Sequence, residues 1–136
     1  MKKQLFISIF FLLIPFSASI FAQQVEDQTE EVVTDTTVKI VDIEDLYAEA
    51  HPSASKVTLT MEYVPSTGEV RLHYICMAGN FDQGEAMNTS IAFFEKFATE
   101  NKYKHYAHRE KDKTRYFKDS RGIRMAEYIV YVMFSK

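Results

Sequence analysis

Residues 56–64 (KVTLTMEYV) alternate strictly between apolar and polar side chains. Strict alternation is typical of a strand that buries one face, because successive side chains of a strand point to opposite sides. The segment PSTGE follows as a turn, and VRLHYICM, from Val70 to Met77, has the composition of a returning strand. Two such runs joined by a short loop that contains glycine predict a β-hairpin, with Val70, Leu72, Tyr74 and Cys76 on its buried face.

A helix is predicted over residues 86–101, after the hairpin. Asp82 and Glu85 have the spacing of a helix cap, and the predicted buried stripe consists of Met87, Ile91, Phe94, Phe97 and Ala98. A second, short helix is predicted near the N-terminal side of the hairpin, from a cap at Asp42 to Pro52, with its apolar residues at helical spacing.

The C-terminal third predicts strands rather than a helix. The segments KYKHYAHRE and TRYFK read as strands, DSRG as a hairpin turn, and residues 128–134 as a central strand, because that run is apolar on both faces. We therefore predict an α+β domain over residues 39–136: a small antiparallel sheet of four to five strands, with the main amphipathic helix packed on one face and the short N-terminal helix beside it.

The N-terminus carries the features of a secretory signal peptide. Lys2 and Lys3 precede an apolar run that ends in small residues, which predicts cleavage after Ala22. An uncleaved membrane anchor is the alternative. Residues 23–38 are polar and acidic and are predicted to be a flexible linker. Loss of residues 1–22 removes two lysines and changes the net charge from −3 to −5, and we expect the mature protein in the periplasm or outside the cell.

The sequence offers little support for a catalytic, nucleotide or metal site. Gly79 and Gly84 have the spacing of a phosphate-binding loop, but Glu85 and Ala86 stand where that loop needs Lys and Ser or Thr. His73 and Cys76 fall on opposite faces of a strand, so they are not expected to share an ion. No metal or other cofactor is predicted. Cys76 is the only cysteine, and we interpret it as a buried structural thiol, with a thiol-dependent enzyme or sensor as the less favoured alternative.

Charge is distributed unevenly along the chain. Residues 101–124 contain nine Lys or Arg and three acidic residues, a local net charge of +6, with tyrosines between the cations. Such a segment suits anionic partners, although a solvated surface that only confers solubility is the simpler explanation. The candidate contact residues are Lys102, Lys104, Arg109, Lys111, Lys113, Arg115 and Tyr116.

These features predict a small exported, non-enzymatic binding or assembly module of the bacterial cell envelope. Its contacts would run through the basic, tyrosine-containing C-terminal hairpin. An anionic protein surface, an acidic glycan or a lipid headgroup is the expected partner, and nucleic acid is not expected for an exported protein. The alternative is a self-associating structural protein, because a central strand that is apolar on both faces needs cover on its second face.

Overall fold

The computed structural model describes residues 37–136. The signal peptide predicted over residues 1–22 and nearly all of the linker predicted over 23–38 lie outside this range. In the described part of the chain, no helix is both long enough and apolar enough to cross a membrane.

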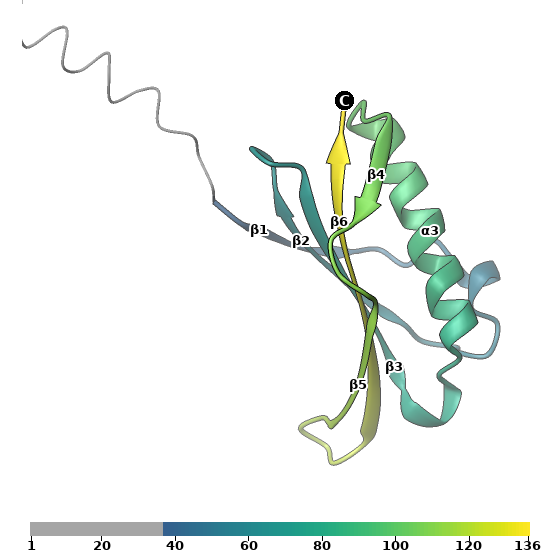
Figure 1. Ribbon diagram of the computed structural model, residues 1–136. Coiled ribbons are helices and arrows are strands. Elements are labelled where there is room, and N and C mark those ends of the chain that lie inside the picture. The colour runs from purple at the N-terminus through teal and green to yellow at the C-terminus, as the bar shows by residue number, and fades with distance from the viewer. Residues whose placement is uncertain (1–36) are drawn as a thin grey trace, which may run out of the picture. The chain divides into compact units, whose positions relative to one another are not determined.

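One antiparallel sheet with a single main helix on one face makes up the described fold, as Figure 1 shows. The strands are β1 (Lys39–Ile43), β2 (Thr58–Val64), β3 (Glu69–Met77), β4 (His105–His108), β5 (Lys113–Lys118) and β6 (Arg124–Ser135), and the helix is α3 (Gln83–Glu100). Their order across the sheet is β1-β2-β3-β6-β4, and β5 also pairs with β6. The α+β prediction is confirmed. The sheet has six strands rather than four to five, because β1 was not predicted. Strands β4 and β5 follow one another along the same side of β6.

The central hairpin forms as its alternation predicts. β2 and β3 pair with Met61 opposite Leu72, and both side chains are buried. The four residues that the sequence assigns to the buried face of β3 are 1% exposed or less. The long last strand β6 is central, as predicted, since it pairs with β3 on one side and with β4 and β5 on the other.

The predicted helix exists, but the stripe assigned to its buried face is partly wrong. Asp82 caps it by accepting a hydrogen bond from the backbone N–H of Glu85 at 3.0 Å. Met87 and Ile91, however, are 42% and 41% exposed. The buried face consists of Ala86, Thr89, Ser90, Phe93, Phe94 and Phe97. The hydroxyls of Thr89 and Ser90 donate to backbone carbonyls one turn earlier, both at 2.8 Å, so these polar side chains can be buried without an unpaired group.

The short N-terminal helix is not present. Residues 39–43 form the edge strand β1, in which Val41 lies opposite Met61 of β2, and only Ala48–Ala50 form a single 3-10 turn, η1. β-branched residues at 40, 41 and 43 favour a strand once β2 is available to pair with. The carboxylate of Asp45 accepts hydrogen bonds from the N–H of Tyr47 and from the ring of His51 instead of capping a helix.

Candidate functional site

The basic segment forms one long edge of the sheet, interrupted by a bulge. His108 at the end of β4 lies opposite Val132, and Lys113 at the start of β5 lies opposite Ile129. The four residues 109–112, which we call the edge bulge, therefore lie opposite only two residues of β6. Arg109 still donates its N–H to the carbonyl of Tyr131 at 2.8 Å. Bulges of this kind turn side chains in new directions and are frequent near functional sites.

On the helix side of the sheet, the edge bulge brings Asp112 against Tyr128. The Tyr128 hydroxyl donates a short hydrogen bond to Oδ2 of Asp112, and Nε2 of His108 lies 3.5 Å from Oδ1 of the same carboxylate. Burial, and then the hydrogen bond to Asp112, raise the pKa of Tyr128. The hydroxyl therefore remains a proton donor at neutral pH and is poorly suited to act as a nucleophile or base.

Two hollows lie beside this cluster, between α3 and the edge, and we call them together the helix-side groove. A mainly apolar hollow of about 210 Å³ and a shallower one of about 560 Å³ share Met87, His108 and Asp112 as lining residues. Ile91 adds apolar surface to the smaller hollow, which is large enough for one apolar side chain of a partner.

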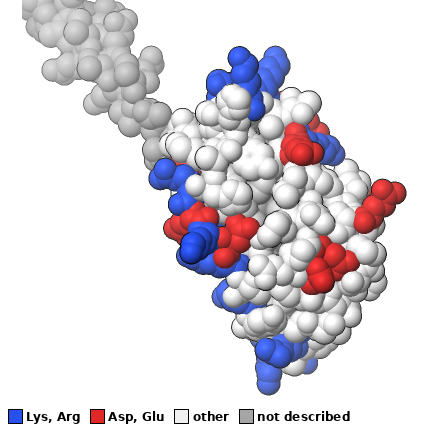
Figure 2. All heavy atoms as spheres, turned by 45° about the vertical axis from the view of Figure 1, so that its right-hand side comes forward, with Lys and Arg blue, Asp and Glu red and all other residues white. Residues whose placement is uncertain are grey.

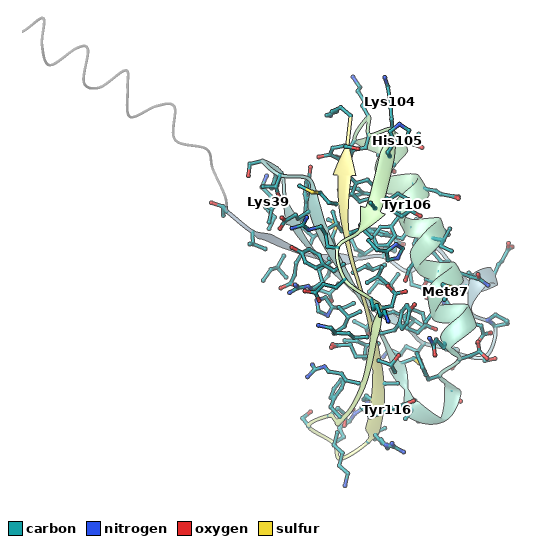
Figure 3. The ribbon with its side chains drawn as sticks, viewed as in Figure 1. Lys39, Met87, Lys104, His105, Tyr106 and Tyr116 are labelled. Atoms are coloured by element: carbon teal, nitrogen blue, oxygen red, sulfur yellow. The ribbon has the colours of Figure 1, made fainter. Side chains whose placement is uncertain are left out.

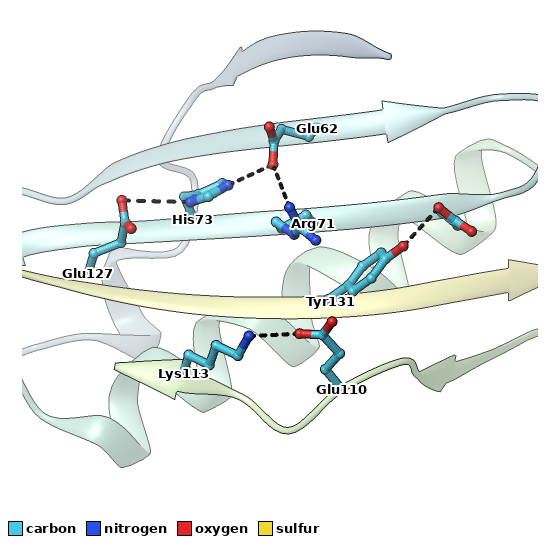
Figure 4. Close-up of polar contacts among 8 residues, drawn as sticks. Glu62, Arg71, His73, Glu110, Lys113, Glu127 and Tyr131 are labelled. Atoms are coloured by element: carbon cyan, nitrogen blue, oxygen red, sulfur yellow. Dashed lines mark hydrogen bonds and ion pairs between the residues drawn. The ribbon is translucent and has the colours of Figure 1, made fainter. Parts of the chain in front are cut away.

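A chain of carboxylate, histidine and arginine side chains crosses the opposite face of the sheet, and Figure 4 shows its part from Glu127 through His73 to Glu62. Arg115 on β5 donates to Glu127 on β6 at 2.5 Å, and Glu127 lies 3.6 Å from Nδ1 of His73 on β3. Nε2 of His73 contacts Glu62 on β2 at 3.0 Å. Glu127 is only 5% exposed, and a buried carboxylate needs a charged partner. The Arg115 guanidinium supplies that charge, and its hydrogen bond to Glu127 raises the pKa of Arg115.

A small hollow with mostly basic walls lies on this same face. Its volume is about 220 Å³, and it is lined by Arg71, His73, Glu110, Lys111, Lys113, Ile129 and Tyr131. The one carboxylate among them, Glu110, pairs with Lys113 at 2.9 Å, and the hydrogen bond from this lysine lowers the pKa of Glu110. We call this hollow the outer-face pocket. Its excess of cations suits an anionic group.

The structure brings together only some of the seven predicted contact residues. Arg109 and Lys111 belong to the edge bulge, and Lys113 lines the outer-face pocket beside Lys111. Lys104 and Tyr116 lie at opposite ends of the molecule in Figure 3, and Lys102 lies with Lys104 in the turn between α3 and β4. Figure 2 likewise shows basic side chains gathered at both ends of the visible face.

Tyr116 and Arg115, which are neighbours in the sequence, point to opposite faces of β5. Tyr116 lies opposite the buried Ala126, its ring contacts Phe81 edge to face, and the guanidinium of Arg124 lies 4.7 Å from its centre. Tyr116 therefore lies on the helix face of the sheet, where it remains 51% exposed, whereas Arg115 belongs to the charge network of the other face.

Sequence reasoning missed the carboxylates of the charge network and the Asp112–Tyr128 pair. The Glu62–Arg71 pair could have been found, since the predicted hairpin places these residues opposite each other and the structure brings their charged groups within 3.8 Å. Glu127 gave no such signal, because its position beside His73 depends on the pairing of β3 with the distant strand β6.

Cys76 has the properties of an unreactive buried thiol. It is 1% exposed, and burial raises the pKa of its thiol, although the nearby Tyr74 opposes part of that shift. We expect the native protein to react with a disulfide reagent such as Ellman's reagent more than about a hundredfold more slowly than the denatured protein, because the thiol must first be exposed by local unfolding. Reaction of native Cys76 as fast as that of the denatured chain would restore the thiol-dependent alternative.

No protein-family model matches this chain, and neither the curated proteins nor the solved structures contain a match to it. Within residues 37–136 there is no group of three or more His, Cys, Asp or Glu side chains that could hold a metal ion. The function must therefore be inferred from the edge and its adjoining hollows.

Proposed function

We propose that the protein is an exported, non-enzymatic binding or assembly module of the cell envelope, and that its contacts run through the basic edge of the sheet. The observation that carries this proposal is the position of the +6 segment. It forms one edge of the sheet, with the helix-side groove on one face and the outer-face pocket on the other.

The six cations among the predicted contact residues divide into two groups. Arg115 and Lys113 are paired with Glu127 and Glu110 and stabilise the local structure. Lys102, Lys104 and Lys111 are exposed, and no ion pair involves them within residues 37–136. These three, together with Arg109, are available to the carboxylate, sulfate or phosphate groups of an anionic protein, an acidic glycan or a lipid headgroup.

The state of the nucleophilic groups supports a binding role rather than catalysis. Burial raises the pKa of both Tyr128 and Cys76, so both groups remain protonated near neutral pH. A tyrosine or cysteine that acts as a nucleophile or base needs the opposite shift.

Neutralising three of these four available cations tests the proposal. In a variant with Lys104→Gln, Arg109→Gln and Lys111→Gln, binding to anionic vesicles or to an immobilised acidic polysaccharide should weaken by about a hundredfold, because each cation near an anionic surface contributes about 1 kcal/mol. Co-sedimentation with phosphatidylserine vesicles and retention on the polysaccharide, both at two salt concentrations, provide the measurement. Binding of the unchanged protein should weaken as salt increases.

A matched variant controls for total charge. It carries Lys39→Gln, Lys56→Gln and Lys96→Gln, which remove the same charge from exposed positions outside the basic segment. This variant should lose much less of the binding. Equal losses in the two variants would mean that only net charge matters, and unchanged binding of the edge variant would refute the proposed contact surface.

A further inference from the structure

Exposed apolar side chains gather at the two opposite edges of the sheet. At the β1 edge, Ile40 is 70% exposed, and Val38, Val41 and Leu46 are also exposed. At the other edge, Met87 and Ile91 border the apolar hollow of the helix-side groove. In Figure 3, Lys39 on β1 and Met87 on α3 lie on opposite sides of the molecule.

Both edge strands offer unpaired backbone groups for a further strand. Among the described residues, β1 pairs only with β2, and β4 pairs only with β6. An exposed apolar edge is a common site of pairing with another chain. The β5 part of the basic edge is less suited to this, because Lys113, Arg115 and Lys118 and the adjacent edge bulge discourage strand addition.

The charges at the C-terminal ends of β1 and β4 are complementary. β1 begins with Lys39, but Asp42 lies near its end, and Glu44 and Glu49 follow closely in the sequence. The four-residue strand β4 is preceded by Lys102 and Lys104 and followed by Arg109 and Lys111. When β1 of another copy runs in the same direction as β4, its acidic C-terminal end would therefore meet Arg109 and Lys111.

We propose that β1 of a second copy adds alongside β4, so that copies join edge to edge into a continuous sheet. This inference rests on the proposed function, in that it names a second copy of the chain as a partner of the basic edge. Each neighbouring pair of strands is antiparallel, so β1 and β4, at the first and fifth positions, run in the same direction. When two copies join with their helices on the same face of the continuous sheet, β4 of one copy and β1 of the next therefore run parallel.

The apolar hollow receives a side chain in this arrangement. Val41 lies opposite the buried Met61 and so shares the helix face of the sheet, as does Tyr106, which lies opposite the buried Phe134. An incoming β1 thus directs Val41 toward the hollow bordered by Met87 and Ile91. The contact is heterologous, and each added copy presents its own β4 edge, so assembly continues until a ring closes or grows as an open chain.

Variants of each edge test the inference by sedimentation velocity on the protein isolated from the cell. The weight-average mass should rise with concentration without stopping at a dimer. Ile40→Lys with Val41→Lys at the β1 edge should abolish this rise, and so should Met87→Lys with Ile91→Lys at the β4 edge. Met77→Lys is the control, because Met77 is 48% exposed but lies in neither edge strand and does not line the helix-side groove. It should assemble as the unchanged protein does.

Mixing the two edge variants gives the sharpest result. The β1 variant retains an intact β4 edge, and the β4 variant retains an intact β1 edge, so their mixture should form a heterodimer that does not grow further. A protein that remains monomeric at all concentrations, or a closed dimer insensitive to the β4-edge variant, would overturn the inference. Neither result would decide the proposed function, which is tested separately by the loss of binding to anionic probes.

Discussion

The free energy of unfolding should decrease as the pH rises above about 6.5, because the fold contains a buried, protonated histidine. His51 is 2% exposed, and its two ring nitrogens both face acceptors. Nδ1 lies 3.0 Å from the carbonyl oxygen of Ala54, and Nε2 lies 2.9 Å from Oδ2 of Asp45. A carbonyl and a carboxylate can only accept, so the two contacts together favour the imidazolium form, in which both nitrogens carry a proton.

The direction of the pH effect follows from the shift in the pKa of His51. Burial alone lowers this pKa from 6.5, but the hydrogen bonds to Asp45 and Ala54 and the charge of Asp45 raise it by more, and the net shift is upward. Tyr74, the other ring in contact, lies edge to face at 6.0 Å and is itself protonated because burial raises its pKa. The stabilisation is therefore complete below pH 6.5 and is lost as the pH rises through the higher pKa of the folded state.

Replacing His51 tests this account. His51→Gln should destabilise the protein by about 3 kcal/mol at pH 6, since one amide cannot satisfy both acceptors and the carboxylate of Asp45 loses its charged partner. Urea unfolding between pH 5.5 and pH 8.5 should show that this difference shrinks as the pH rises. His105→Gln is the control, because His105 is exposed on β4, and it should change stability by less than about 0.5 kcal/mol. A destabilisation by His51→Gln that is the same at every pH would contradict the buried imidazolium.

The sequence predicted those parts of the fold that depend on neighbouring residues. The β2–β3 hairpin, the turn at DSRG, the cap at Asp82 and the strand character of residues 128–134 all follow from alternation, turn residues or composition over short segments. Strand β1 was mistaken for part of a helix because Ile43, Leu46 and Tyr47 have helical spacing. Its actual structure depends on pairing with β2, which begins fifteen residues after β1 ends.

The orientation of α3 shows the limit of hydrophobicity as a guide to burial. Met87 and Ile91 are more hydrophobic than Thr89 and Ser90, yet the latter two are buried. Small hydroxyl side chains fit where the helix lies close to the sheet, and bonding to the helix backbone removes the penalty for burying them. The exposure of Met87 and Ile91 therefore results from the packing of the helix, and it is this exposure that gives the β4 edge its apolar surface.

The candidate site was predictable in its charge but not in its geometry. The excess of cations in residues 101–124 can be read from the sequence, but their distribution over two faces and two ends of the sheet cannot. The two-residue difference between the β4–β6 and β5–β6 registers creates the edge bulge. Because the two registers differ by an even number of residues, side chains alternate between the two faces of the sheet in the same way in β4 and in β5. The sequence pattern therefore does not reveal the bulge.

Replacing Gly68 by alanine should destabilise the protein by about 3 kcal/mol or more. Gly68 ends the β2–β3 turn with φ of +80°, where a side chain costs about 1–3 kcal/mol in itself. A Cβ at this position would also lie 2.5 Å from the carbonyl oxygen of Phe134 near the end of β6. That oxygen belongs to backbone that cannot rotate away, and the N–H of Phe134 donates to the carbonyl of Gly68 at 2.8 Å. Urea or thermal unfolding of Gly68→Ala measures the effect.

Gly122 provides the matched control, because it separates backbone strain from the close approach to β6. It lies in the β5–β6 turn with φ of +79°, and a Cβ there would meet no other atom within 4 Å. Gly122→Ala should therefore cost only the strain of the left-handed conformation, about 1–2 kcal/mol. The difference between the two variants measures how tightly the β2–β3 turn is held against β6. If Gly68→Ala and Gly122→Ala destabilise the protein equally, the turn does not pack against Phe134 as the structure describes.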